Sequence, residues 1–125
     1  MLVRRYHPDY LMVQPMGCDE VGHLEGGESD DYMRQASKTD RLLAEMEPGW
    51  LARGYHVLVT SDHGMDRRGQ QGGTRPEVTT VPLYHLGCAH GRAYDEEASQ
   101  LSIAPTFLTL MHLKPGETMT APILV

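Results

Sequence analysis

Residues 55–65 read YHVLVTSDHGM, and this stretch decides the expected fold. Val57, Leu58 and Val59 form a continuous apolar run between a glycine and a polar loop. Such a run predicts a strand over residues 55–61 that lies in the interior of a sheet. Asp62 and His63 follow it directly. In α/β proteins, ligand-binding groups gather where the strands of a parallel sheet end, so this dipeptide is the first candidate site.

The upstream sequence predicts a strand, a turn and a helix. YLMVQP, residues 10–15, is a short apolar run that ends in a proline and predicts a buried strand. Residues 16–29 contain four glycines and are predicted to be a turn. Ser29 stands before two aspartates and predicts the start of a helix. Apolar residues recur from there at helical spacing as far as Met46, and Pro48 should break or kink the helix.

The downstream sequence completes an alternation of strands and helices. Residues 62–79 are rich in glycine and charge and are predicted to be a loop. TVPLYHLG, residues 80–87, predicts a third strand, and residues 99–112 predict a helix. Strand–helix–strand order is typical of α/β proteins. We therefore expect a mostly parallel sheet flanked by helices.

Length and composition narrow the class of protein. The chain has 125 residues, of which 40% are hydrophobic and 22% charged, and we expect residues 1–125 to form a single soluble domain. Its net charge of −6 comes without a basic block, which argues against nucleic acid as a polymer partner. No apolar stretch approaches the about 20 residues of a membrane span. The opening residues MLVRRYHPDY lack the apolar core of a secretory signal, so we expect no membrane partner and a cytoplasmic chain.

Two acid–histidine pairs are the candidate metal ligands. Asp19 and His23 follow the first predicted strand at a spacing of four, and Asp62 and His63 follow the next. Carboxylate oxygen and imidazole nitrogen are ligands that zinc and manganese accept. One such pair alone is commonly a loop cap beside a surface histidine. Two pairs at neighbouring strand ends favour a two-metal site, in which both ions hold a phosphoryl group.

The strings that contain these pairs resemble a known family. MVQPMGCDEVGH, residues 12–23, VTSDHGM, residues 59–65, and GGTRPEVTTVPLYHLG, residues 72–87, are similar to the type I phosphodiesterase/nucleotide pyrophosphatase family of the alkaline phosphatase superfamily. The closing segment SIAPTFLTLMHLKPGETMTAPIL also resembles that family, so the resemblance spans residues 10–124. It implies an alkaline-phosphatase-like fold, of which this chain is the C-terminal, metal-binding portion and a partial domain.

The resemblance also implies a role for each candidate ligand. Asp19 and His23 match two ligands of one zinc ion, and Asp62 and His63 match two ligands of the other; manganese is the alternative metal. The family completes the first site with a histidine directly before Gly-Gly, and here that position is Gln71. An amide oxygen is a poorer zinc ligand than imidazole. Gln71 is therefore a weak candidate ligand, and this site should be loosened or empty.

Three other residues near these strings have two interpretations each. His85 and His90 could replace the missing histidine ligand, although positions in a strand and in a loop explain them more simply. Arg75 could contact a phosphate as a bidentate donor, or it could be an ordinary surface arginine of the loop.

The implied activity is metal-dependent hydrolysis of phosphoric esters, either phosphodiesters or nucleotide pyrophosphate bonds. The substrate would be a phosphate ester or a nucleotide. The family's nucleophile, a Thr or Ser that opens a helix, belongs to the N-terminal half that this chain lacks. No hydroxyl here stands in such a turn, so the catalytic residues are unassigned; those considered are Thr39, Thr60, Ser61 and Thr74.

The alternative is a catalytically inactive α/β fragment or binding module. A partial domain leaves a sheet edge unpaired, and we therefore also expect a homo-oligomer formed through an exposed edge.

Overall fold

A computed structural model describes residues 2–87 and 97–124, which fall into two compact units. One unit contains residues 11–87, and the other contains residues 2–10 together with residues 97–124. The first unit includes both acid–histidine pairs.

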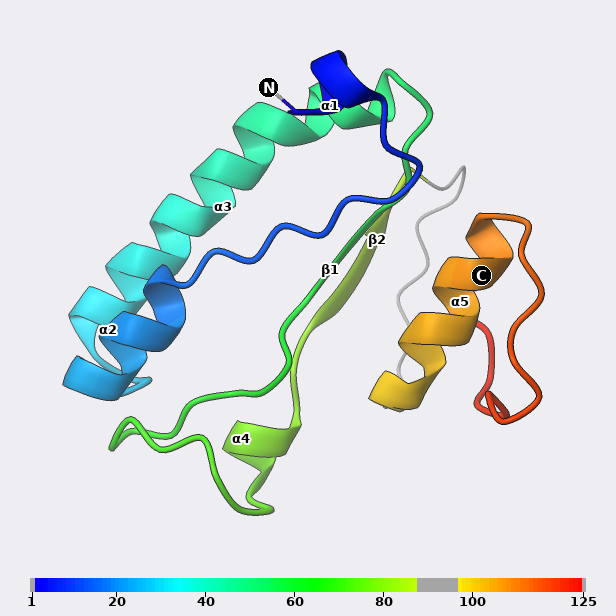
Figure 1. Ribbon diagram of the computed structural model, residues 1–125. Helices are drawn as coiled ribbons and strands as arrows, with labels where there is room; N and C mark the ends of the chain where they lie inside the picture. The colour runs from blue at the N-terminus through cyan, green and yellow to red at the C-terminus, as the bar shows by residue number, and fades with distance from the viewer. Residues whose placement is uncertain (1, 88–96, 125) are drawn as a thin grey trace. The chain divides into compact units, whose positions relative to one another are not determined.

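A helical hairpin forms one part of the first unit (Figure 1). Helix α2, Gly17–Glu25, packs against helix α3, Asp30–Leu51, and a short turn joins them. Ser29 caps α3, because its Oγ accepts a hydrogen bond from the backbone N–H of Tyr32 at 3.1 Å. The predicted start of this helix is confirmed.

One prediction about these helices is wrong, and one alternative of another is not found. Residues 16–29 were predicted to be a turn, yet most of them form α2. A Cβ at Gly22 would lie 2.9 Å from Met65 Cε, so this glycine serves close packing of the helix and not a turn. Pro48 does not break helix α3, which continues through it to Leu51. Trp50 is buried there, and the Ala52 N–H still donates to the Pro48 carbonyl at 3.1 Å; this packing offsets the hydrogen bond that proline cannot make.

The described strands form a two-stranded antiparallel sheet. Strand β1, Val57–Thr60, pairs with β2, Leu83–Leu86, so that the end of β1 lies beside the start of β2. Both strands were predicted, and the protein combines helices with a sheet as expected. The mostly parallel arrangement is not found among the described residues. Residues 10–15 lack regular structure, so the strand predicted there is wrong.

The connection between the two strands explains why they are antiparallel. It contains one short helix, α4, Pro76–Thr79, and folds back on itself. The Gly64 N–H donates to the Val78 carbonyl at 2.7 Å, which ties the outgoing arm of the connection to the returning arm. A Cβ at Gly64 would lie 2.1 Å from the Glu77 carbonyl oxygen, so only glycine permits this approach. The chain therefore returns beside β1 in the opposite direction.

The outgoing arm is anchored to the helical hairpin through Asp66. The Asp66 carbonyl accepts a hydrogen bond from the Gly27 N–H, in the turn between α2 and α3, at 2.8 Å. The Asp66 side chain is buried, and it accepts hydrogen bonds from the backbone N–H groups of Arg68 and Gln70 and pairs with Arg75. The Gln70 N–H and then the Arg75 guanidinium lower the pKa of Asp66 to about 2.

The second unit is built around helix α5, Ile103–Leu110, which a single 3-10 turn, Gln100–Ser102, precedes. The helix predicted over residues 99–112 is thus confirmed with shorter bounds. Phe107 meets Tyr10 edge to face at 4.9 Å between ring centroids. The Leu124 N–H donates to Thr106 Oγ1 at 2.9 Å and ties the C-terminal segment to α5. Helix α1, Leu2–Tyr6, belongs to the same unit.

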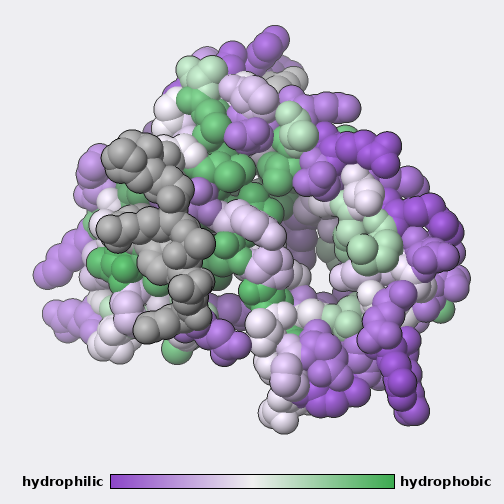
Figure 2. All heavy atoms as spheres, turned by 180° about the vertical axis from the view of Figure 1, so that it is seen from behind, coloured by the Kyte–Doolittle hydropathy of each residue, from purple (hydrophilic) through white to green (hydrophobic). Residues whose placement is uncertain are grey.

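Several hydrophobic side chains are exposed, and hydrophobic atoms remain visible on the face shown in Figure 2. Leu24 and Met12 are 80% and 71% exposed, and no residue of β1 or β2 is fully buried. Exposed apolar surface of this kind is typical of a chain that packs against further protein. None of the helices in the described part of the chain has both the length and the apolar character needed to cross a bilayer.

We expect Asp66→Asn to lower the free energy of unfolding near neutral pH. The pKa of Asp66 is about 2 in the folded chain, below the about 3.9 of an unfolded aspartate. Its charge therefore stabilises the fold above about pH 4, and this contribution is lost as the pH falls from about 4 toward about 2. Urea unfolding of both chains across this range should show the difference shrinking below about pH 4.

The control for this experiment is Asp40→Asn, at an exposed position of α3. It should change the free energy of unfolding by less than about 0.5 kcal/mol. A destabilisation by Asp66→Asn that is as large in acid as at neutral pH would show that the charge of Asp66 is not its cause.

Candidate metal centre

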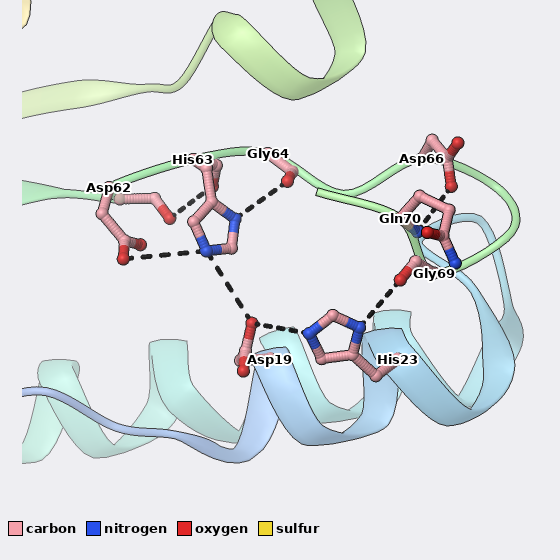
Figure 3. Close-up of polar contacts among 9 residues, drawn as sticks. Asp19, His23, Asp62, His63, Gly64, Asp66, Gly69 and Gln70 are labelled. Carbon is pink, nitrogen blue, oxygen red and sulfur yellow. Dashed lines mark hydrogen bonds and ion pairs between the residues drawn. The ribbon is translucent and has the colours of Figure 1, made fainter. Parts of the chain in front are cut away.

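The four predicted ligands meet where α2 faces the loop that follows β1 (Figure 3). Asp19 and His23 are four residues apart on α2, so their side chains project from one face of that helix. Asp62 and His63 come directly after β1. The two pairs, which are about forty residues apart in sequence, are thus brought together, as the sequence predicted.

Asp19 lies between the two imidazoles (Figure 3). Its Oδ1 is 3.6 Å from His23 Nε2 and 3.9 Å from His63 Nε2, and Asp62 Oδ2 is 3.7 Å from the same nitrogen of His63. These separations are too long for hydrogen bonds. Two atoms that each bind a tetrahedral zinc ion at about 2.1 Å lie about 3.4 Å apart. The observed separations exceed that value by a few tenths of an ångström.

Both imidazoles are held by backbone carbonyls. His23 Nδ1 donates to the Gly69 carbonyl at 2.8 Å, and His63 Nδ1 donates to the Gly64 carbonyl at 3.0 Å. A carbonyl can only accept, so Nδ1 has the proton in both rings. In the neutral imidazole, Nε2 then presents a lone pair, here toward Asp19. Metal-binding histidines are typically supported in this way.

One oxygen of the Asp19 carboxylate has no hydrogen-bond donor in the described part of the chain. This oxygen, Oδ1, is buried and accepts no hydrogen bond from the residues that the structure describes. A buried anionic oxygen without a donor is costly, and two imidazole lone pairs nearby add repulsion. A cation between these atoms would remove both costs, so the residues present fit a divalent ion.

The cluster is nevertheless open. Within residues 2–87 and 97–124, no group of three or more His, Cys, Asp or Glu side chains is arranged to hold a metal ion as it stands. The four residues form two pairs, Asp19–His23 and Asp62–His63, which approach each other where Asp19 Oδ1 lies 3.9 Å from His63 Nε2. Neither pair is a closed site of three or four ligands.

The other candidates lie around this cluster. Gln71 is exposed, two residues beyond the Gly69 carbonyl that bonds to His23, and its role as a ligand stays a prediction. The Arg75 guanidinium pairs with Asp66 and lies 3.4 Å from Glu77 Oε1. Arg75 therefore has partners within its own loop, and a phosphate contact stays a prediction.

Of the two histidines considered as substitute ligands, His85 is not at the cluster. His85 lies in β2 opposite Leu58, and its Nε2 is 3.0 Å from His56 Nδ1. Burial and then the neighbouring His56 lower the pKa of His85. His90 lies outside the described residues.

Two residues that support the site were missed in the sequence. Asp66 was not predicted to have a role, although an aspartate that opens an Asp-Arg-Arg-Gly segment is typical of a side-chain-closed turn. Gly69 has φ of +73°, and a Cβ there would lie 2.5 Å from the Gly22 carbonyl oxygen. Its contact with α2 could not be inferred from local sequence, because it joins segments far apart in the chain.

Comparison with known proteins gives a consistent picture. Residues 1–73 match the sequence profile described as type I phosphodiesterase / nucleotide pyrophosphatase, and this range includes both acid–histidine pairs. The 2,3-bisphosphoglycerate-independent phosphoglycerate mutase of Haloarcula marismortui is 31% identical over 94% of this chain and 24% of its own length. The mutase of Laribacter hongkongensis is 34% identical over 86% of this chain and 22% of its own length.

A more distant similarity points in the same direction. GPI ethanolamine phosphate transferase 2 of Candida albicans is 24% identical over 83% of this chain and 13% of its own length. No solved structure gave a significant match. The chain spans about a quarter of the length of the mutases that it matches. The profile covers more than half of the chain, and the mutases cover most of it. On these grounds the chain belongs to the type I phosphodiesterase/nucleotide pyrophosphatase family, among the phosphoryl-transfer enzymes of the alkaline phosphatase superfamily.

Proposed function

We propose that this chain supplies part of the two-metal centre of a hydrolase that acts on phosphodiester or nucleotide pyrophosphate bonds. One observation supports this proposal above the others. The Oδ1 atom of Asp19 is buried without a hydrogen-bond donor among the described residues, and it lies between the Nε2 atoms of His23 and His63. Membership of a phosphoryl-transfer family supports phosphoric esters as the substrates.

Each pair has a defined part in this proposal. Asp19 and His23 would hold one ion, and Asp62 and His63 the other, with zinc as the proposed metal and manganese as the alternative. Divalent ions at such a centre withdraw negative charge from the oxygens of a phosphate ester. Without them, the two carboxylates would repel an anionic substrate. The carbonyls of Gly64 and Gly69 keep each imidazole in the tautomer whose Nε2 can bind a cation.

A second candidate function is a metal-binding module that performs no hydrolysis by itself. The hydroxyls that directly precede Asp62 and His63 in sequence both donate to backbone carbonyls. Thr60, at the end of β1, donates to the Pro82 carbonyl at 2.9 Å, and Ser61 donates to the His63 carbonyl at 2.7 Å. A hydroxyl that is held by a backbone carbonyl is poorly placed to attack phosphorus. This observation favours a nucleophile from elsewhere in the family's catalytic domain.

Zinc binding should require the acid–histidine pairs. We expect the chain to bind zinc more weakly than a closed site does, because each pair offers only two ligands. Asp62→Ala combined with His63→Ala should weaken zinc binding by more than the about tenfold that loss of an outer-shell partner costs. Titration calorimetry with zinc and then with manganese is the measurement.

The matched control is Asp40→Ala combined with His56→Ala, which removes the same side-chain types elsewhere in the same unit. It should leave the affinity of the acid–histidine pairs unchanged. Tight binding of two zinc ions that survives substitution of Asp62 and His63 would contradict the assignment.

Gln71→His should tighten zinc binding by adding an imidazole donor where the amide is a poor ligand. The gain should disappear in a His23→Ala background, because ligands of one ion are coupled. Gln70→His adds the same group one residue earlier and should give no comparable gain. Unchanged affinity in Gln71→His would mean that the loop does not bring this position to the Asp19–His23 pair.

The 125-residue chain alone should not hydrolyse a nitrophenyl phosphodiester above background, with or without added zinc. The reason is that covalent catalysis needs an activated nucleophile, and Thr60 and Ser61 both donate to carbonyls. Release of nitrophenol, followed by absorbance, is the measurement. Zinc-dependent turnover that Ser61→Ala abolishes would show that the chain is a hydrolase without any further part.

A further inference from the structure

Asp66 is a buried carboxylate beside the candidate centre to which the proposed function gives no role. It is 2% exposed and lies three residues after His63. Its Oδ1 accepts hydrogen bonds from the backbone N–H groups of Arg68 at 2.8 Å and Gln70 at 2.7 Å, and its Oδ2 pairs with Arg75. Three donors from one loop therefore converge on a single side chain.

These bonds close residues 66–70 into a turn. The Gly69 N–H donates to the Asp66 carbonyl at 3.0 Å, and the Asp66 N–H donates to the Gln70 carbonyl at 3.0 Å. Gly69 adopts the left-handed conformation inside this turn, with φ of +73°. The side chain and the backbone of Asp66 thus both determine where Gly69 lies.

The turn is in direct contact with α2. A Cβ on Gly69 would lie 2.5 Å from the Gly22 carbonyl oxygen and 2.9 Å from that of His23, so there is no room for a side chain. The Gly69 carbonyl accepts the hydrogen bond from His23 Nδ1 at 2.8 Å (Figure 3). The His23 side chain is 42% exposed, so packing alone leaves its ring considerable freedom.

We propose that Asp66 is a positioning residue for His23: by closing the 66–70 turn, it holds the Gly69 carbonyl against Nδ1 and keeps the Nε2 lone pair directed at Asp19. A neutral imidazole with no such partner populates both tautomers, and only one of them offers Nε2 as an acceptor. The importance of Asp66 for metal binding rests on the proposed function, which this role of Asp66 deepens. The effect of Asp66 on the His23 ring exists in the metal-free chain.

The test is nitrogen-15 NMR of the histidine side chains in the metal-free 125-residue chain, at about pH 8. His23 should show the Nδ1–H tautomer in the wild type and a mixture of tautomers in Asp66→Ala, which removes the acceptor that closes the turn. His63 should not change, because its Nδ1 bonds to Gly64, which the Val78 carbonyl holds independently. Glu77→Gln, which removes another carboxylate near Arg75, is the matched control and should leave both rings unchanged.

Two outcomes would overturn the proposal. An unchanged His23 ring in Asp66→Ala would show that the turn does not select the tautomer. Equal changes at His23 and His63 would show that Asp66 contributes only to the general stability of the fold. If Asp66→Ala does not fold, Asp66→Ser decides by the same criteria, because serine can still accept one backbone hydrogen bond of the turn.

Zinc titration adds a second readout. Asp66→Ala should weaken zinc binding by about 10–100-fold, as loss of outer-shell support typically does. It should cause no further loss in a His23→Ala background, and an equal loss in both backgrounds would overturn the proposal. A wild-type chain that binds no zinc would refute the proposed function, whereas the tautomer of His23 would still decide the role of Asp66.

Discussion

The contact between the 66–70 turn and α2 is the constraint on which the candidate centre depends. Two hydrogen bonds of 2.8 Å make it: the Gly27 N–H donates to the Asp66 carbonyl, and His23 Nδ1 donates to the Gly69 carbonyl. They join α2 and the turn that follows it to a loop about forty residues further along the chain. These hydrogen bonds hold the loop that contains Asp62 and His63 beside the helix that contains Asp19 and His23, so that Asp19 faces His63.

Two carboxylates near this contact, Asp66 and Asp19, have opposite surroundings. Asp66 is buried with three donors and is stable as an anion without any metal. Asp19 is the opposite case, because its buried Oδ1 has no donor among the described residues and two imidazole nitrogens lie 3.6 and 3.9 Å away. One carboxylate therefore organises the loop, and the other has the unpaired oxygen on which the proposed metal site rests. This division agrees with membership of a phosphoryl-transfer family.

The features that the sequence by itself determined are those that depend on neighbouring residues. Ser29 was predicted as the cap of α3 because capping involves residues within one helical turn. The strands at 57–60 and 83–86 were predicted from short apolar runs. The two acid–histidine pairs could also be identified from the sequence, because Asp19 and His23 stand at helical spacing and Asp62 and His63 are adjacent. Their convergence was expected, although from a parallel sheet that the described residues do not form.

Only the tertiary structure decided how these pieces meet. Helix α2 forms through a glycine-rich segment because Gly22 lets Met65 pack closely against it. The strands are antiparallel because the Gly64–Val78 hydrogen bond turns their connection back on itself. Asp66 gains its role only when the loop closes beside α2. Each of these features arises from contacts between residues far apart in the chain, which local propensity and periodicity do not encode.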